Sequence, residues 1–346
     1  MKAFSRLLLA VGFLGALGLG LFQLPAVQDS LFRRAVSGVM TAPRAPFEGL
    51  QVVVCGSASP LGNSPNHAQA CLAVLTPEHF FLFDVGARAP LRIAQARLPL
   101  GRLDGVFLTH FHSDHIAGLP DVNLASWVQG RPAPLMIYGP EGVATVVEGF
   151  NAAYALDRGY RVAHHGADTL PPALGPMAAT ALAETGVVWA DETLTIRAVR
   201  VDHDPASPAL GYRIDYGGRS VVISGDSNAS AALFSLAEGA DLLFHDALSR
   251  TLLDPMIAQA KAAGLDPLPK IMTDVIDYHA DVQSLLAPAK AARVGQLVLY
   301  HLVPVPPNGL AERLFRRGLP KEVILAQDLQ RFDLPRGQKD ILIHAP

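Results

Sequence analysis

The 346-residue chain has few cysteines, few charged residues and no excess of basic ones. Its two cysteines, Cys55 and Cys71, are too few to form a disulfide framework. They lie in successive strand-like segments and could pair if those strands were neighbours, but we expect two small buried hydrophobic side chains. The net charge of −3 gives no basic surface of the kind that grips a phosphate backbone, so the composition disfavours a nucleic-acid partner without excluding one.

Charge is scarcest near the amino end of the chain. Lys2 and Arg6 precede an apolar stretch, residues 7–28, that carries no charged side chain. As a helix these 22 residues would rise about 33 Å, enough to cross a bilayer, although a cleaved secretory signal is the alternative. We favour an uncleaved anchor within residues 1–28, followed by a connector at 29–48. This predicts a membrane-anchored or secreted protein whose globular domain lies outside the cytoplasm.

The remaining residues, 49–346, alternate short strand-like runs with helical ones. Residues 70–75 and 80–83 flank a turn and predict a hairpin, and Gly217-Gly218 joins two further strands. Hairpins and crossover connections together favour an α/β fold, α+β in some schemes, with mixed sheets covered by helices. Residues 154–185 break this rhythm, and we interpret them as an insertion or lid because compact domains seldom need so long a loop.

The most informative run of the chain is Thr-His-Phe-His-Ser-Asp-His. It places His110, His112, Asp114 and His115 within six residues. Imidazoles and a carboxylate packed this closely repel one another when charged and compete for hydrogen-bond partners when neutral. A divalent cation resolves both problems, and zinc favours this mixture of nitrogen and oxygen ligands. The run therefore predicts a metal site.

Three later apolar runs also stop at a histidine or an aspartate. They end at His203, at Asp226 in Ser-Gly-Asp, and at His301. Taken singly, each is an ordinary polar residue at the point where a strand leaves the core. Together with the first run they supply the extra donors that a two-metal site needs, presented by loops on a rigid base.

In this order the motifs resemble the metallo-β-lactamase superfamily, and within it the branch that holds ribonuclease Z and arylsulfatase-like hydrolases. The resemblance covers residues 50–346 and implies an αββα sandwich, two mixed sheets flanked by helices, with two divalent metal ions, expected to be Zn²⁺, at one edge. It implies that His110, His112 and His203 hold the first metal, that Asp114, His115 and His301 hold the second, and that Asp226 bridges them. A hydroxide shared by the metals would be the nucleophile, oriented by Asp114.

The resemblance also implies supporting roles. His279 matches the histidine of the His-Ser-Thr motif of ribonuclease Z, which is linked to protonation of the leaving group, although Ala280-Asp281 replaces Ser-Thr here. We expect His279 to be the general acid, with a supporting role as the alternative. Asp84 is expected to orient the metal-binding loop, and the pair His245-Asp246 is expected to support the site from behind, with a buried, hydrogen-bonded histidine as the alternative for His245.

Three further histidines remain open. His67 lies in a loop that faces the site in relatives and is a candidate substrate contact, with a plain surface histidine as an equal alternative. His164 and His165 lie in the predicted insertion, and the sequence gives them no role.

The resemblance implies a metal-dependent hydrolase. Because residues 154–185 are not basic and we recognise no arm that would grip transfer RNA, we favour a small-molecule phosphodiester or sulfate ester as substrate. A transfer RNA 3′-processing endoribonuclease is the alternative, and a lactone or β-lactam hydrolase or a non-catalytic metal-binding protein stays open, since the fold cannot choose among them. Expected partners are the small ester, the membrane through the amino-terminal segment, and, in a homodimer, a second copy of the chain.

Overall fold

The computed structural model describes residues 20–41, 47–61 and 64–346, and the chain divides into two compact units after Pro46. The first unit contains helix α2 (Pro25–Thr41). This helix occupies much of the segment that was predicted to be a connector, because residues 25–41 contain no proline after the first position to interrupt it.

The predicted membrane location is contradicted. Residues 7–19 of the predicted anchor lie outside the described residues. The described remainder is helical over 20–22, turns at 23–24 and continues into α2, which carries the charged residues Asp29, Arg33 and Arg34. Within the described ranges, no helix is both long enough and apolar enough to cross a bilayer. The prediction of a membrane-anchored or secreted protein is therefore wrong.

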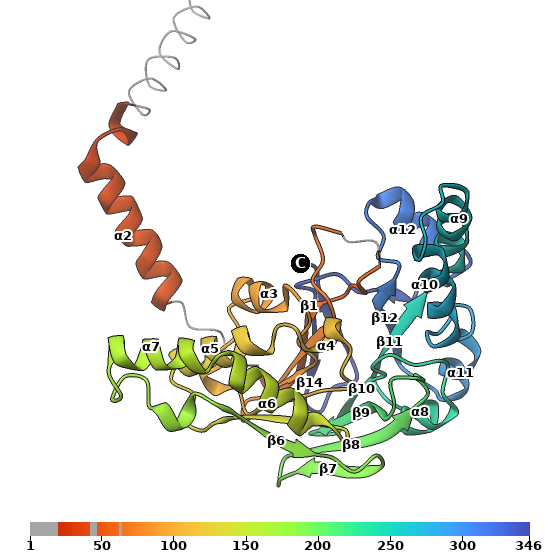
Figure 1. Cartoon of the computed structure of the whole chain (residues 1–346), viewed down its shortest axis with the longest axis horizontal. Helices are drawn as coiled ribbons and strands as arrows, with labels where there is room; N and C mark the ends of the chain where they lie inside the picture. The colour runs from red at the N-terminus through yellow and green to blue at the C-terminus, as the bar shows by residue number, and fades with distance from the viewer. Residues whose placement is uncertain (1–19, 42–46, 62–63) are drawn as a thin grey trace, which may run out of the picture. The chain divides into compact units, whose positions relative to one another are not determined.

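The second unit, residues 47–346, is built on two mixed β-sheets (Figure 1). The first sheet has the order β15 (Leu342–His344), β14 (Arg331–Pro335), β1 (Gly49–Gly56), β2 (Cys71–Leu75), β3 (Phe80–Phe83), β4 (Gly105–Phe107), β5 (Leu135–Gly139), β6 (Met177–Ala181). The second has the order β13 (Ile324–Leu325), β12 (Gln296–Val303), β11 (Leu242–Leu248), β10 (Arg219–Ile223), β9 (Ala209–Tyr216), β8 (Leu194–Val201), β7 (Gly186–Ala190). Both predicted hairpins are confirmed, since β2 pairs antiparallel with β3 and β9 with β10.

The main hydrophobic core lies between the two sheets. Val52 and Val54 of β1 contribute to it from one side and Ile214 of β9 from the other. The intervening residues of β1, Val53 and Cys55, belong to a different cluster on the outer face of the sheet. This alternation is the period of two that a strand imposes on its side chains. It lets one strand contribute to two layers of core.

Helices cover the outer faces of both sheets. Those packed over the first sheet are α3 (Ala89–Gln95), α5 (Leu119–Val128) and α6 (Val143–Ala153). Those packed over the second are α8 (Ala231–Leu236), α11 (Leu286–Ala291) and α12 (Gly309–Phe315). A fourth cluster holds α9 (Arg250–Ala262) and α10 (Leu268–Asp274) against Leu248 and Val303. The result is the α/β sandwich of two helix-flanked mixed sheets that the sequence predicted.

The two cysteines form a disulfide, contrary to the prediction of two unpaired side chains. Cys55 and Cys71 lie on the adjacent strands β1 and β2, with their Cα atoms 4.9 Å apart and their sulfur atoms 2.02 Å apart. The ladder shifts register between Val54 and Gly56, which places Cys71 beside Gly56 and brings the two thiols together. The bond closes a 16-residue separation.

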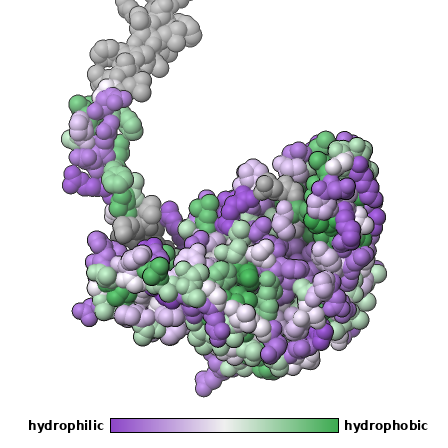
Figure 2. Space-filling view, viewed as in Figure 1, coloured by the Kyte–Doolittle hydropathy of each residue, from purple (hydrophilic) through white to green (hydrophobic). Residues whose placement is uncertain are grey.

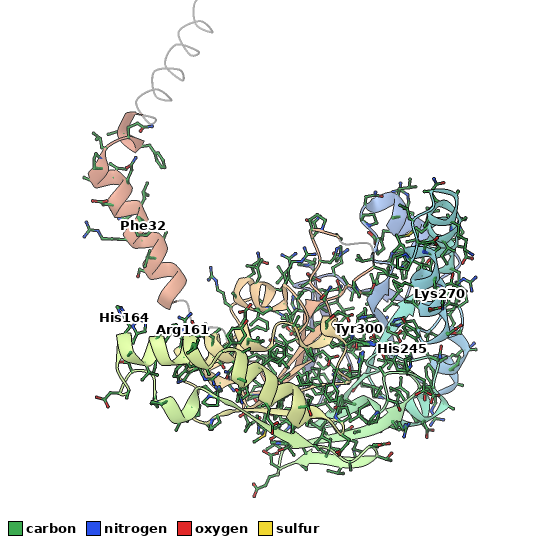
Figure 3. The ribbon with its side chains drawn as sticks, in the orientation of Figure 1. Phe32, Arg161, His164, His245, Lys270 and Tyr300 are labelled. Carbon is green, nitrogen blue, oxygen red and sulfur yellow. A yellow bond between two sulfur atoms is a disulfide. The ribbon has the colours of Figure 1, made fainter. Side chains whose placement is uncertain are left out.

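Residues 154–185, predicted to be an insertion or lid, form regular structure. They contain α7 (Ala155–His165), a short 3₁₀ turn at Pro172–Leu174, and β6, which pairs in parallel with β5. None of the residues of α7 is buried, and Leu156 and Tyr160 are strongly exposed on it. His164 and His165 lie in its last turn. Figure 3 shows the labelled His164 on the opposite side of the view from the labelled His245 and Tyr300. Figure 2 shows that the apolar residues on the visible surface of the molecule occur in small groups among hydrophilic ones, as is normal for a folded protein.

Candidate metal centre and active site

Several loops that follow strands converge at one edge of the sandwich. These loops place His110, His112, Asp114 and His115 after β4, His203 after β8 and Asp226 after β10. His301 joins them from within the strand β12. The single turn of helix α4 (Ser113–Ile116) carries Asp114 and His115. The close approach of the loops requires a glycine at position 225. Its φ is +63°, and a Cβ atom added there would lie only 2.7 Å from the Cβ atom of Thr109.

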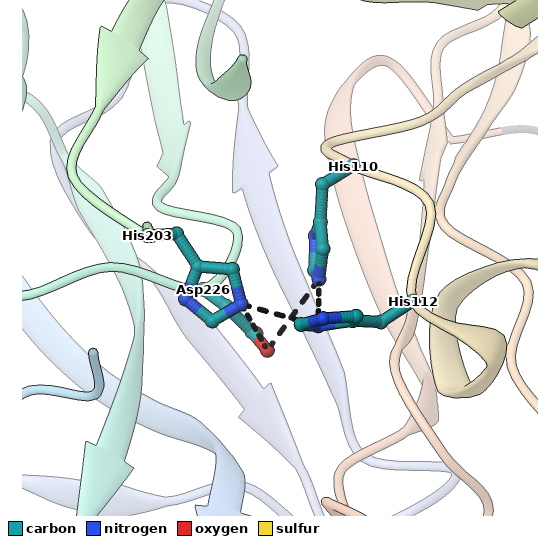
Figure 4. Close-up of side chains that lie close together, drawn as sticks. All are labelled: His110, His112, His203 and Asp226. Carbon is teal, nitrogen blue, oxygen red and sulfur yellow. Dashed lines mark hydrogen bonds and ion pairs between the residues drawn. The ribbon is translucent and has the colours of Figure 1, made fainter. Parts of the chain in front are cut away.

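One group consists of His110, His112, His203 and Asp226, each offering one ligand atom within 4.8 Å of the others (Figure 4). Nδ1 of His112 lies 2.9 Å from Nε2 of His110 and 3.2 Å from Nε2 of His203. Oδ2 of Asp226 lies 3.9 Å from both of those Nε2 atoms. His112 is exposed whereas the other three are buried, so the group is reached from solvent on the His112 side.

The second group consists of Asp114, His115, Asp226 and His301, and all four residues are buried. Nε2 of His115 lies 3.2 Å from Oδ2 of Asp226 and 3.5 Å from Oδ2 of Asp114. Nε2 of His301 lies 3.0 Å from Oδ2 of Asp114. Asp226 is therefore the residue that the two groups share.

Two buried atoms at the junction lack a hydrogen-bond partner. Oδ1 of Asp226 and Nδ1 of His301 lie 3.3 Å apart, yet neither makes a hydrogen bond. An unsatisfied buried polar atom costs about 1–3 kcal/mol, and more when it is charged. A bound cation would remove that cost, and imidazole nitrogens with carboxylate oxygens are the donors that zinc and similar ions accept. The residues present are therefore suited to hold a divalent metal.

The ring nitrogens that face away from the first group are held by neighbouring residues. Nδ1 of His110 lies 3.0 Å from Oγ1 of Thr109. Nδ1 of His203 lies 2.9 Å from the carbonyl oxygen of Tyr278, to which it donates. Such contacts fix the tautomer and leave the opposite nitrogen free to accept a metal ion.

Asp84 does the same for the second group. Its Oδ2 lies 2.8 Å from Nδ1 of His115 and accepts a hydrogen bond of 2.9 Å from Oγ1 of Thr109. Its Oδ1 accepts a 2.8 Å hydrogen bond from the backbone N–H of Thr109. The backbone of Asp84 has φ +56°, a conformation that aspartate and asparagine tolerate better than most residues. The structure thus places Asp84 directly behind the second group.

Burial controls the protonation of the first group. It lowers the pKa of His203 and lowers that of His110 well below its usual value, with nearby imidazoles adding to the effect on His110, and partial burial of the ring lowers the pKa of His112 although that residue is exposed overall. These three rings are therefore neutral near pH 7, as metal ligands must be.

Charge controls the second group. Burial alone would lower the pKa of His115 and His301, but the carboxylate of Asp226 acts together with those of Asp84 and Asp114 on His115, and with that of Asp114 on His301, and raises both. Burial alone would raise the pKa of Asp114, but His115 and His301 lower it to about 2. Without a metal this group holds imidazolium–carboxylate pairs, and a cation entering it has to displace protons.

His279 lies beside both groups. Its ring centroid is 5.3 Å from that of His203 and 5.4 Å from that of His301. Its Nδ1 lies 2.8 Å from Oδ2 of Asp246, a fully buried carboxylate. Burial would raise the pKa of Asp246, but the hydrogen bonds from His245 and His279 lower it, so Asp246 is anionic and orients the His279 ring.

Two residues from the sequence analysis are not in contact with the groups. His245 is buried, but its ring stacks on Phe234 and its Nδ1 faces Asp246, so the contact to His279 comes from Asp246 instead. His67 bonds to Oγ of Ser64 at 2.9 Å and lines a separate cavity of about 340 Å³. Of the pair His245-Asp246, it is therefore the carboxylate of Asp246 that reaches His279.

Comparison with known proteins identifies the family. Residues 80–302, more than half of the chain, match the family described as beta-lactamase superfamily domain. A ribonuclease Z of Mycobacterium sp. strain KMS is 35% identical over 293 residues, which cover 83% of this chain and 97% of that protein. A ribonuclease Z of Mycobacterium bovis (strain BCG / Pasteur 1173P2) is 37% identical over 267 residues, which cover 76% of this chain and 90% of that protein.

Solved structures share the fold. The metallo-β-lactamase fold protein YhfI from Bacillus subtilis aligns with a TM-score of 0.59 and 20% identity over 82% of this chain and 98% of its own. The short form of human tRNase Z aligns with a TM-score of 0.57 and 23% identity over 82% of this chain and 99% of its own. The chain therefore belongs to the metallo-β-lactamase superfamily, in its ribonuclease Z branch, and is a metal-dependent hydrolase.

Proposed function

We propose that the chain is a phosphodiesterase that cleaves RNA, as a ribonuclease Z does, with two divalent cations that we expect to be zinc. The observation that carries the proposal is the pair of four-residue groups that share Asp226. Relatives named ribonuclease Z, matched over 97% of their length, support RNA as the substrate. They favour the transfer RNA-processing alternative over the small ester that the composition suggested.

The proposed roles follow from the geometry. His110, His112 and His203 would hold one cation, Asp114, His115 and His301 the other, and Asp226 both. When bound, such a pair of cations lowers the pKa of a water molecule and offsets the charge that develops on a phosphate during displacement. Asp84 would keep the His115 ring in the metal-binding tautomer.

His279 would act as the general acid. Hydrolysis joins the oxygen of water to phosphorus and breaks the bond between phosphorus and the leaving oxygen, which must gain a proton. Because Asp246 holds Nδ1 of His279, the proton on Nε2 is the one available for that oxygen. A positioned acid of this kind contributes roughly 10²- to 10⁴-fold in rate.

The test of the substrate is a panel assayed with the full chain reconstituted with zinc. We expect cleavage of precursor transfer RNA and of bis(p-nitrophenyl) phosphate, and no turnover of p-nitrophenyl sulfate or of a lactone. Turnover of the sulfate with no cleavage of the precursor would replace the proposal by its second candidate, a small-ester hydrolase. The net charge of −3 is the observation that favours this second candidate.

The test of the acid is His279→Ala with two leaving groups. p-Nitrophenolate needs no proton to depart, so its release should change little. Cleavage that expels a ribose oxygen should slow by about 10²-fold or more. Equal slowing of both reactions would assign His279 a role in maintaining the site instead of a role as acid.

A further inference from the structure

The side chain of Tyr278 is a feature of the site that the roles above leave unused. Its ring centroid lies 5.0 Å from that of His203, with the rings at 88°, and 5.0 Å from that of His279, with the rings at 53°. The side chain is partly exposed, whereas His203 and His279 are buried. An aromatic side chain therefore borders the site next to both a proposed metal ligand and the proposed acid.

The structure holds this ring in place. The carbonyl oxygen of Tyr278 accepts the hydrogen bond from Nδ1 of His203. Nδ2 of Asn228 donates to the preceding carbonyl, that of Asp277, at 2.7 Å. The side chain packs against the buried cluster that contains Leu248 and Val303. A fixed surface loses little conformational freedom when a ligand binds, which favours recognition.

The phenol is also neutral at the pH at which the site would work. Burial raises the pKa of Tyr278, and the carboxylates of Asp274, Asp226 and Asp114 raise it further. The ring therefore adds no negative charge to a site that receives an anionic phosphate. What it offers is a flat, uncharged π-surface.

We propose that Tyr278 determines specificity: its ring stacks on a planar group, an aryl ring or a nucleobase, attached to the leaving oxygen of the substrate. The inference rests on the proposed function, because it uses His279 to mark the side of the leaving oxygen. Tyr278 and His279 are consecutive residues with rings 5.0 Å apart, so a group on that oxygen comes within reach of the phenol. Stacking on an aromatic side chain changes binding by roughly 5- to 150-fold per base.

The experiment measures binding, so that it does not depend on which ester is cleaved. Zinc-loaded full chain is titrated by calorimetry with phenylphosphonate and with ethylphosphonate, which share the anion but differ in the planar ring. The variants are Tyr278→Leu, which removes the π-surface, and Tyr278→Phe, which keeps it. Tyr160→Leu is the matched control, since Tyr160 is exposed on α7. Zinc content is measured for each protein.

We expect Tyr278→Leu to raise the Kd for phenylphosphonate about 5-fold or more and to leave that for ethylphosphonate unchanged. Tyr278→Phe and Tyr160→Leu should both behave as the unaltered chain does. Equal weakening of both ligands in Tyr278→Leu, an equal loss in Tyr278→Phe, or equal affinity of the unaltered chain for the two ligands would each overturn the inference. Failure to cleave RNA, by contrast, would overturn the proposed function and leave this binding difference standing.

Discussion

The substitution Asp84→Asn is expected to weaken zinc binding more than it lowers the free energy of unfolding. Asp84 uses both oxygens: Oδ1 accepts the backbone N–H of Thr109 at 2.8 Å, and Oδ2 lies 2.8 Å from Nδ1 of His115. The asparagine side chain has a single acceptor oxygen, and that oxygen would accept the hydrogen bond from the fixed backbone N–H of Thr109. The amide nitrogen must then face Nδ1 of His115 and donate to it. That contact forces the remaining ring proton onto Nε2, the atom of His115 that faces Asp114 and Asp226.

The expected magnitude follows from this change of tautomer. A cation in the second group has to displace a proton from Nε2, and loss of such a supporting contact costs about 10- to 100-fold in metal affinity, or about 1.4–2.7 kcal/mol. The free energy of unfolding should change less, because asparagine tolerates the φ of +56° at this position. Asp84→Ala should lose more stability, since alanine adds about 1–2 kcal/mol of backbone strain and leaves the N–H of Thr109 unpaired.

The assay is competition for zinc with a chromophoric chelator at neutral pH, with urea unfolding measured in parallel. Asp333→Asn is the control, because Asp333 is a buried carboxylate in β14 that accepts a 2.7 Å hydrogen bond from Gln51, outside both groups. It should lower stability and keep zinc affinity. Unchanged affinity for both zinc ions in Asp84→Asn would refute the tautomer argument.

Three further predictions concern the shared ligand, pH and the disulfide. Asp226→Ala should reduce bound zinc from two ions to one or none and abolish phosphodiester hydrolysis; elemental analysis with two ions still bound would rule out the bridging role. As the pH falls, the second group should release its ion first, because carboxylates raise the pKa values of His115 and His301 while burial lowers those of the first group's imidazoles. Calorimetry at stepped pH would measure the order of release, and release of the first group's ion before that of the second would contradict the prediction. Replacing Cys55 and Cys71 by alanine should lower the free energy of unfolding by about 3 kcal/mol, because the closed loop spans 16 residues; an unchanged urea midpoint would show that the loop is ordered without the bond.

The sequence is sufficient to predict which donors gather at the candidate site. His110, His112, Asp114 and His115 lie within six residues, so their proximity needs no knowledge of the fold. The other donors follow apolar runs, and the ends of sheet strands are where loops can meet. The strand period and the hairpin turns are local signals too, which is why mixed sheets covered by helices were predictable, whereas the two-sheet sandwich was implied by the family resemblance.

Other features depend on the order of strands, which local patterns do not reveal. The bond between Cys55 and Cys71 requires β1 and β2 to be neighbours and requires the register shift near Gly56. Similarly, residues 154–185 have an irregular composition, yet they include the edge strand β6 because β5 offers it a partner. Composition at the amino end was misleading, since the described residues after 19 turn at 23–24 and continue into a helix that carries charge from Asp29 onward.

The choice between His245 and Asp246 shows what strand order adds. In β11, Phe244 belongs to the core between the sheets, whereas Leu243 and Ala247 belong to the outer cluster. His245 shares the outer parity and stacks on Phe234 accordingly. Asp246 shares the parity of Phe244 and faces His279. Alternation thus separates the two residues once the faces of the strand are known.

His301 breaks that alternation. Its neighbours Leu299 and Leu302 lie in the outer cluster, and Tyr300 lies between the sheets. A regular strand would give Leu302 the same face as Tyr300. The ladder instead skips His301, pairing Asp246 with Tyr300 and Ala247 with Leu302, and His301 takes φ +44°. A bulge of this kind re-aims one side chain. It turns the ring of His301 toward Asp114 and Asp226, so the last donor reaches the site through a backbone irregularity that no hydrophobic pattern encodes.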